Sequence, residues 1–98
     1  MVNHPLQINN LNELRNYVHQ TLCDQHDLEP GSFRVTERIL VRGKQPCGIF
    51  FCLHGPRSVT LTAIWETDRN TILFYNSSGE RAGKAQLVQA PSLAPLAA

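Results

Sequence analysis

Three cysteines and two histidines are the residues of this chain whose types and spacing could do chemistry. They are Cys23, His26, Cys47, Cys52 and His54. Thiolate sulfur and imidazole nitrogen are the ligands that Zn²⁺ prefers, in a tetrahedral arrangement. Cys23 and His26 are three residues apart and would share a helix face, whereas Cys52 and His54 are two apart and would share a strand face. If the end of the helix overlay that strand face, these four side chains could converge on one metal ion.

The pattern around these ligands nevertheless favours cysteines that bind no metal. The spacing is not one of the short knuckles typical of zinc sites. Cys47 and Cys52 have opposite strand parity, so both cannot lie on one flat face without a bulge. Free cysteine is among the most buried residue types, and a chain with so much apolar strand does not need a metal to fold. We therefore expect buried, inert thiols and no cofactor, with a zinc-stapled module as an alternative.

A cysteine nucleophile is the second chemistry that these residues suggest, with Cys52 or Cys47 as the thiolate and His54 or His26 as the base. Such a thiolate needs an accessible, electropositive position. Cys52 instead lies in the most apolar segment of the chain, where burial raises a thiol's pKa. No third, orienting residue can be identified, and no phosphate-binding glycine loop is present. We expect a protein that is not an enzyme.

Basic residues gather in one part of the chain. Residues 31–60 carry five cations against one carboxylate and residues 1–30 carry one cation against four, so the two segments have net charges of +4 and −3 within a total of +1. The candidate binding residues are Arg34, Arg38, Arg42, Lys44, Phe50, His54 and Arg57. Aromatic rings among arginines on an open sheet suit single-stranded nucleic acid, and equally a dimer or a protein partner.

One amphipathic helix and a run of strands must position these side chains. Asn10 with Glu13 three residues later forms the start of a helix over about residues 11–26, which must end before Pro30. The β-rich runs are 33–42, 48–54, 59–65 and 71–75, separated by turns at 43–46, 54–57 and 68–70, and a weaker fifth run spans 81–88. Connections this short join neighbouring strands. The sequence predicts an α+β domain over residues 1–88, with the helix packed on a four- or five-stranded antiparallel meander, and a disordered tail over 89–98.

The helix can cover only one face of such a sheet. In the first and third runs the odd positions are apolar, so they should meet the helix, and the even positions should form an open face. The second and fourth runs are apolar on both sides, and their parity stays undecided. With the same parity, Phe50, Cys52 and His54 would join the open face, as would Ile72 and Phe74. We expect an interaction module that binds a protein partner or itself through this face; the alternative is single-stranded nucleic acid bound by the basic and aromatic residues.

The composition is that of an ordinary soluble protein, with 42% hydrophobic and 17% charged residues among 98. No apolar run approaches the roughly 18 residues of a spanning helix, and no secretory signal precedes the domain, so we expect no membrane association and a cytoplasmic location. An odd number of cysteines fits reduced thiols in that compartment.

Two segments carry a resemblance to known proteins. Residues 42–57 (RGKQPCGIFFCLHGPR) and 63–75 (AIWETDRNTILFY) resemble short bacterial proteins of planctomycete type to which no activity is attached. The resemblance covers about half of the chain. It implies a bacterial, cytosolic origin and assigns no role to any residue.

Overall fold

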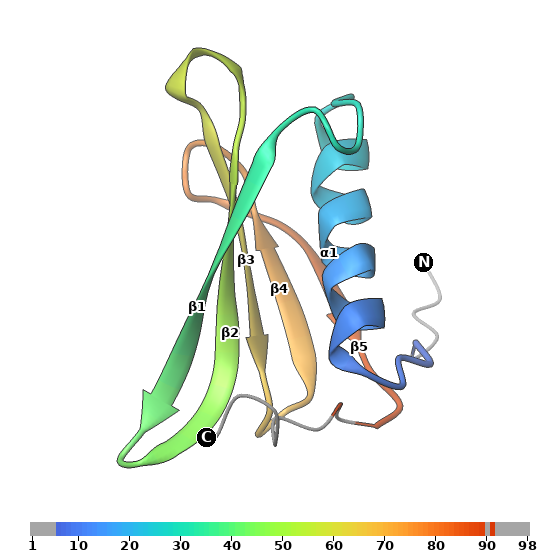
Figure 1. Ribbon diagram of the computed structural model, residues 1–98, viewed down its shortest axis with the longest axis vertical. Coiled ribbons are helices and arrows are strands. Elements are labelled where there is room, and N and C mark those ends of the chain that lie inside the picture. Colours follow the sequence, from blue (N-terminus) through green and yellow to red (C-terminus); the bar gives the residue numbers. More distant parts are fainter. Residues whose placement is uncertain (1–5, 90, 92–98) are drawn as a thin grey trace.

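One helix packs against one face of a five-stranded sheet in the computed structural model, which describes residues 6–89 and 91 (Figure 1). The strand order is β1-β2-β3-β4-β5 and every neighbouring pair is antiparallel. The predicted α+β meander with an N-terminal helix is therefore confirmed, with the weak fifth run present as a strand. The elements are α1 (Leu11–Gln25), β1 (Arg34–Arg42), β2 (Gln45–His54), β3 (Thr60–Glu66), β4 (Thr71–Tyr75) and β5 (Arg81–Gln86).

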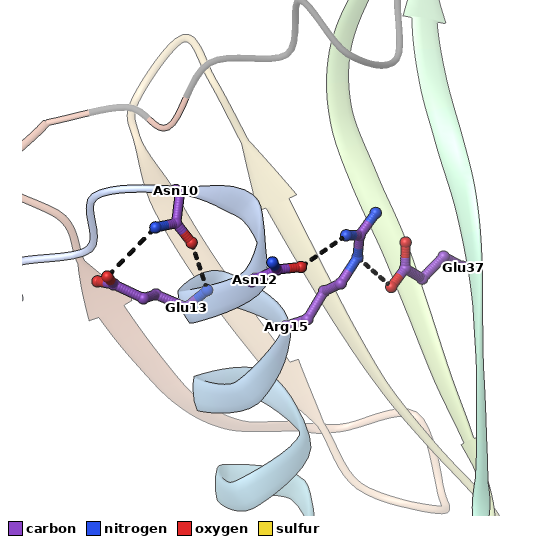
Figure 2. Close-up of polar contacts among 5 residues, drawn as sticks. All are labelled: Asn10, Asn12, Glu13, Arg15 and Glu37. Atoms are coloured by element: carbon purple, nitrogen blue, oxygen red, sulfur yellow. Dashed lines mark hydrogen bonds and ion pairs between the residues drawn. The ribbon is translucent and has the colours of Figure 1, made fainter.

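Both ends of α1 are capped. The side-chain oxygen of Asn10 accepts a hydrogen bond of 2.9 Å from the backbone N–H of Glu13, as the sequence predicted (Figure 2). The Glu13 carboxylate accepts in turn from the backbone N–H of Asn9, one residue before the cap. At the other end Asp27 adopts a φ of 54° and the N–H of Leu28 bonds to the carbonyl of Cys23, which is the Schellman pattern. The helix therefore ends at Gln25.

The core lies between α1 and the sheet. Leu14, Val18 and Leu22 are fully buried on the inner side of the helix. The opposing sheet face supplies the largest buried side chains, Phe51, Trp65 and Phe74 among them. Tyr17 meets the Phe74 ring edge-on, with 6.3 Å between centroids, and so contacts the sheet. An ion pair between Arg15 Nε and Glu37 Oε2, 2.8 Å long, joins α1 to β1 (Figure 2).

A bulge separates the turn after β1 from the rest of β2. The turn contains only Gly43 and Lys44, because Arg42 already faces Gln45; the four-residue turn predicted over 43–46 is wrong. Val41 then faces Pro46, but Leu40 faces Gly48, so Cys47 is an extra residue on β2.

The segment before the helix takes part in the structure. Leu6 forms a single parallel bridge with Leu87, in which the Leu6 N–H donates to the Gln86 carbonyl over 2.7 Å. Ile8 and Leu87 are both buried, so the segment before the helix contributes to the core together with the end of the chain that it pairs with. Most of the predicted tail, residues 90 and 92–98, lies outside the described residues; Pro91 is buried.

Candidate interaction surface on the open sheet face

The sheet face turned away from α1, called here the open face, presents rows of side chains that cross the strands. Strand pairing places five residues in its central row: Arg38, Phe50, Ile64, Leu73 and Lys84. The two end residues are exposed cations, and the three apolar side chains between them are half-buried. No element within residues 6–89 covers this row (Figure 1).

A second row runs beside the first and is more polar. It contains Thr36, Cys52, Thr62, Tyr75 and Arg81. The hydroxyl of Thr36 lies 3.0 Å from Nε2 of His54, which fixes that imidazole against β1. The guanidinium of Arg81 lies over the Tyr75 ring, 5.8 Å from its centroid.

The twist of the sheet and the spacing of these rows leave shallow hollows on the open face. One is lined by Arg38, Phe50, Cys52 and His54 together with Thr36 and Glu37. A second is lined by Leu40, Arg42, Cys47, Ile64 and Glu66, with Asp68 and Arg69 at its rim. Because Cys47 is the bulged residue, its side chain joins even-numbered neighbours on this face.

Positive charge dominates the open face and its rim. Six cations stand against three carboxylates, of which Glu37 is paired with Arg15 of α1: Arg34, Arg38, Arg42, Arg69, Arg81 and Lys84 against Glu37, Glu66 and Asp68. Arg42 donates from Nη1 to the Asp68 carboxylate, and this hydrogen bond raises the pKa of Arg42 above its already high ordinary value. Asp68 therefore neutralises Arg42, while most of the other cations remain available to an anionic ligand.

The structure brings together most of the predicted binding residues, but not all of them. Arg34, Arg38, Arg42, Phe50 and His54 lie on the open face. Lys44 lies in the turn between β1 and β2, and Arg57 lies in the short 3₁₀ segment Pro56–Ser58 that follows β2. A strand of ten residues, roughly 34 Å long, separates these two cations, so they do not belong to one site.

The parity of β4 differs from that of β1, β2 and β3. Ile72 and Phe74, which equal parity would have placed on the open face, are buried beneath α1. The reason is the four-residue connection between β3 and β4, which pairs Glu66 with Thr71 and so aligns even positions with odd ones. Leu73 and Tyr75 therefore occupy the open face, and sequence reasoning missed both; the length of the loop is the signal that could have found them.

The cysteines and histidines do not converge as a metal site. Cys23 belongs to α1 and is buried in the core between the helix and the sheet, whereas Cys52 and His54 project from the opposite face, so the sheet lies between the two halves of the proposed ligand set. In the part of the chain that the structure describes, no three His, Cys, Asp or Glu side chains are grouped closely enough to hold a metal ion. His26 caps the helix end on the Cys23 side and cannot serve Cys52 as a base.

The thiols also differ from the expectation that all are buried. Burial raises the pKa of the Cys23 thiol, with a further contribution from the charge of Asp24. Cys47 and Cys52 are only half-buried on the open face. The expectation of buried thiols is correct for Cys23 alone.

Comparison of the chain with protein-family models, with curated proteins and with solved structures finds no match. No helix among the described residues has the length and hydrophobicity needed to cross a membrane.

Proposed function

We propose that this protein is a small, non-enzymatic interaction module of the bacterial cytoplasm, and that its open face binds an acidic protein partner. The observation that carries the proposal is the central row of the open face. It places three half-buried apolar side chains, Phe50, Ile64 and Leu73, in contact with solvent between the cations Arg38 and Lys84. An apolar centre with a polar, charged rim is the usual anatomy of a protein interface.

The charge of the face favours a different protein over a second copy bound face to face. Two copies of the open face would bring its excess of cations together, at a cost from like charges. A partner whose apolar patch is bordered by aspartate and glutamate would complement both the centre and the rim. It would also associate faster at low salt.

The Cys52–His54 pair supports a binding role more than a catalytic one. Thr36, not a thiol, is the hydrogen-bond partner of His54 Nε2. The hollow beside this pair is open and carries Arg38 and Phe50. Arg38 and Phe50 can contact the surface of a partner protein as they stand, whereas catalysis by Cys52 would need an activated thiolate.

Affinity capture from a lysate of the source cells, followed by quantitative mass spectrometry, tests the proposal. Leu73→Glu places a carboxylate in the centre of the open face, and Val59→Glu places one on an exposed valine of the β2–β3 connection. We expect a partner with an acidic surface that the wild type and Val59→Glu retain, that Leu73→Glu loses by about tenfold or more, and that high salt releases. Equal capture by all three proteins would contradict the proposal.

Single-stranded nucleic acid is the second candidate, because Phe50 and Tyr75 both lie on the open face among cations. Bases stack on such rings while the backbone meets the cations. Arg81 already covers one side of Tyr75, so a stacked base would compete with it. Titration with a labelled oligothymidylate separates the candidates: salt-sensitive binding that Arg38→Ala abolishes and Lys44→Ala retains favours nucleic acid, and no binding at low salt excludes it.

A further inference from the structure

β1 forms one edge of the sheet over nine residues. Its neighbour on one side is β2, and on its other side no strand of the described chain pairs with it. The opposite edge is different, because the chain after β5 pairs with Leu6 through hydrogen bonds to Gln86 and from Val88. A long edge with free backbone groups is a template for another strand.

Exposed apolar side chains accompany this free edge. Ile39 is 39% exposed and Val41 is 57% exposed, and these are two of the four exposed large hydrophobic residues among the residues described. Both belong to the odd-numbered side of β1, the side on which α1 packs, but the half of β1 that carries them extends away from the helix (Figure 1). The free edge is therefore also an apolar surface.

We propose that two copies of this chain pair through β1, antiparallel, about a two-fold axis at Ile39, and form one continuous ten-stranded sheet. The occupant of the edge is a second copy because the sequence of β1 complements itself in this register. In an antiparallel pair, two facing residues project to the same side of the sheet. A two-fold axis perpendicular to the sheet must therefore lie between one residue and the same residue of the other copy. Only a few registers need to be compared.

Like charges exclude the neighbouring registers. An axis at Arg38 would oppose the two copies of Arg38 and would set Arg34 against Arg42. An axis at Glu37 would oppose two carboxylates, and an axis at Leu40 would set Arg38 against Arg42. Like charges directly opposite each other are destabilising in a sheet.

The axis at Ile39 avoids such a clash among residues 36–42, and its one facing pair of cations, Arg34 with Lys44, lies at the turn beyond the end of β1. The facing pairs in this register are Ile39 with Ile39, Arg38 with Leu40, Glu37 with Val41 and Thr36 with Arg42. The exposed apolar side chains on the odd-numbered side, Ile39 and Val41, then come together across the axis. The arginines of the even-numbered side alternate with Thr36 and Leu40.

This contact uses a different surface from the proposed partner site. A two-fold axis perpendicular to the sheet keeps both copies of α1 on one side and joins the two open faces on the other. The dimer therefore leaves the central row accessible in both copies. The β1–β1 contact of the dimer and the partner contact on the open face can therefore form at the same time.

Light scattering coupled to gel filtration measures the association. We expect a dimer for the wild type, and a dissociation constant raised by about tenfold or more, equivalent to roughly 1.4 kcal/mol, in Ile39→Arg, which opposes two cations on the axis. Val59→Arg is the matched control, because Val59 is 36% exposed but lies beyond β2 at another end of the sheet. A monomeric wild type at high concentration, or a dimer that Ile39→Arg leaves intact, would overturn the proposal.

Disulfide trapping tests the register. In a chain with Cys47→Ser and Cys52→Ser, single cysteines replace Ile39, Arg38 or Glu37 in turn. Facing residues of an antiparallel pair have Cα atoms about 4.5–5.5 Å apart, within reach of a disulfide. We expect oxidation by diamide to cross-link Ile39→Cys to its own copy in most of the protein; preferential cross-linking of Arg38→Cys or Glu37→Cys would overturn the assigned pairing. Loss of the dimer would leave the affinity-capture result for Leu73→Glu unaffected, so the two proposals can fail separately.

Discussion

The indole N–H of Trp65 donates a hydrogen bond to the side-chain oxygen of Asn70, 3.2 Å away. The side-chain amide of Asn70 donates in turn to the backbone carbonyl of Leu87. The backbone carbonyl of Asn70 accepts from the N–H of Leu87. Asn70 has a φ of 48°, which closes the connection between β3 and β4. One residue thus satisfies a buried indole, forms a turn and holds the segment after β5.

Replacement of Asn70 by alanine should lower the free energy of unfolding by about 2–4 kcal/mol, since it leaves the Trp65 N–H without a partner and strains a left-handed residue. Asn70→Gly keeps the backbone conformation and loses only the side-chain bonds, so we expect a smaller loss. Urea unfolding followed by fluorescence of the single tryptophan measures both. Equal stability of Asn70→Ala and the wild type would contradict this role.

Gly48 should not tolerate a methyl group. A Cβ at this position would lie 2.1 Å from the backbone carbonyl oxygen of Trp65, and neither β2 nor β3 can move without disturbing the core. We expect Gly48→Ala to lower stability by about 2–3 kcal/mol or to prevent folding. Gly83→Ala is the control, because a Cβ there would meet the flexible end of Gln25 at 3.1 Å and should cost much less. Thermal unfolding by circular dichroism compares the two, and similar melting temperatures would refute the assignment.

The N-cap should be worth about 1 kcal/mol. Asn10→Ala removes the acceptor for the Glu13 N–H, and its unfolding free energy should fall by that amount. Asn12→Ala is a matched control in the same turn, because Asn12 only accepts a long bond of 3.4 Å from Arg15. Chemical denaturation of both variants gives the comparison. A larger loss in Asn12→Ala than in Asn10→Ala would show that the cap is not the stabilising contact.

Stability should fall in alkaline solution partly because of Cys23. The fold raises the pKa of this thiol above its ordinary value of about 9, so the folded state holds the proton more tightly than the unfolded state does. The resulting stabilisation is complete below pH 9 and declines as the pH rises through the folded pKa. Urea unfolding at pH 7 and pH 10 gives, for each protein, the loss of unfolding free energy between the two pH values. We expect the wild type to lose more than Cys23→Ala. Parallel losses in the two proteins would contradict the prediction.

Local signals in the sequence predicted the elements well. The amphipathic pattern and the Asn10 cap predicted α1, and turn residues between β-rich runs predicted the meander. These signals are contained in a few neighbouring residues, and they depend on backbone preferences that the tertiary structure did not override.

Signals that depend on pairing between strands were less accessible. The side of β4 that faces the helix depends on how Glu66 pairs with Thr71, and both sides of that strand are apolar. The bulge at Cys47 and the bridge between Leu6 and Leu87 need knowledge of a partner strand. The open face could therefore be predicted for β1 and β3, and only conditionally for β2 and β4.

The bulge at Cys47 decides which side of β2 faces the helix. If β2 paired regularly from the two-residue turn onward, Arg38 would face Ile49, and Phe50, Cys52 and His54 would turn towards the helix. Because Cys47 is skipped in the pairing, Arg38 faces Phe50 instead. Deletion of Cys47 would therefore join Pro46 directly to Gly48 and leave Val41 opposite Pro46 and Leu40 opposite Gly48 in a regular ladder. Deletion of a paired residue such as Ile49 would instead turn the part of β2 beyond it to the opposite side. A one-residue deletion should thus be tolerated at Cys47 and not at its paired neighbours.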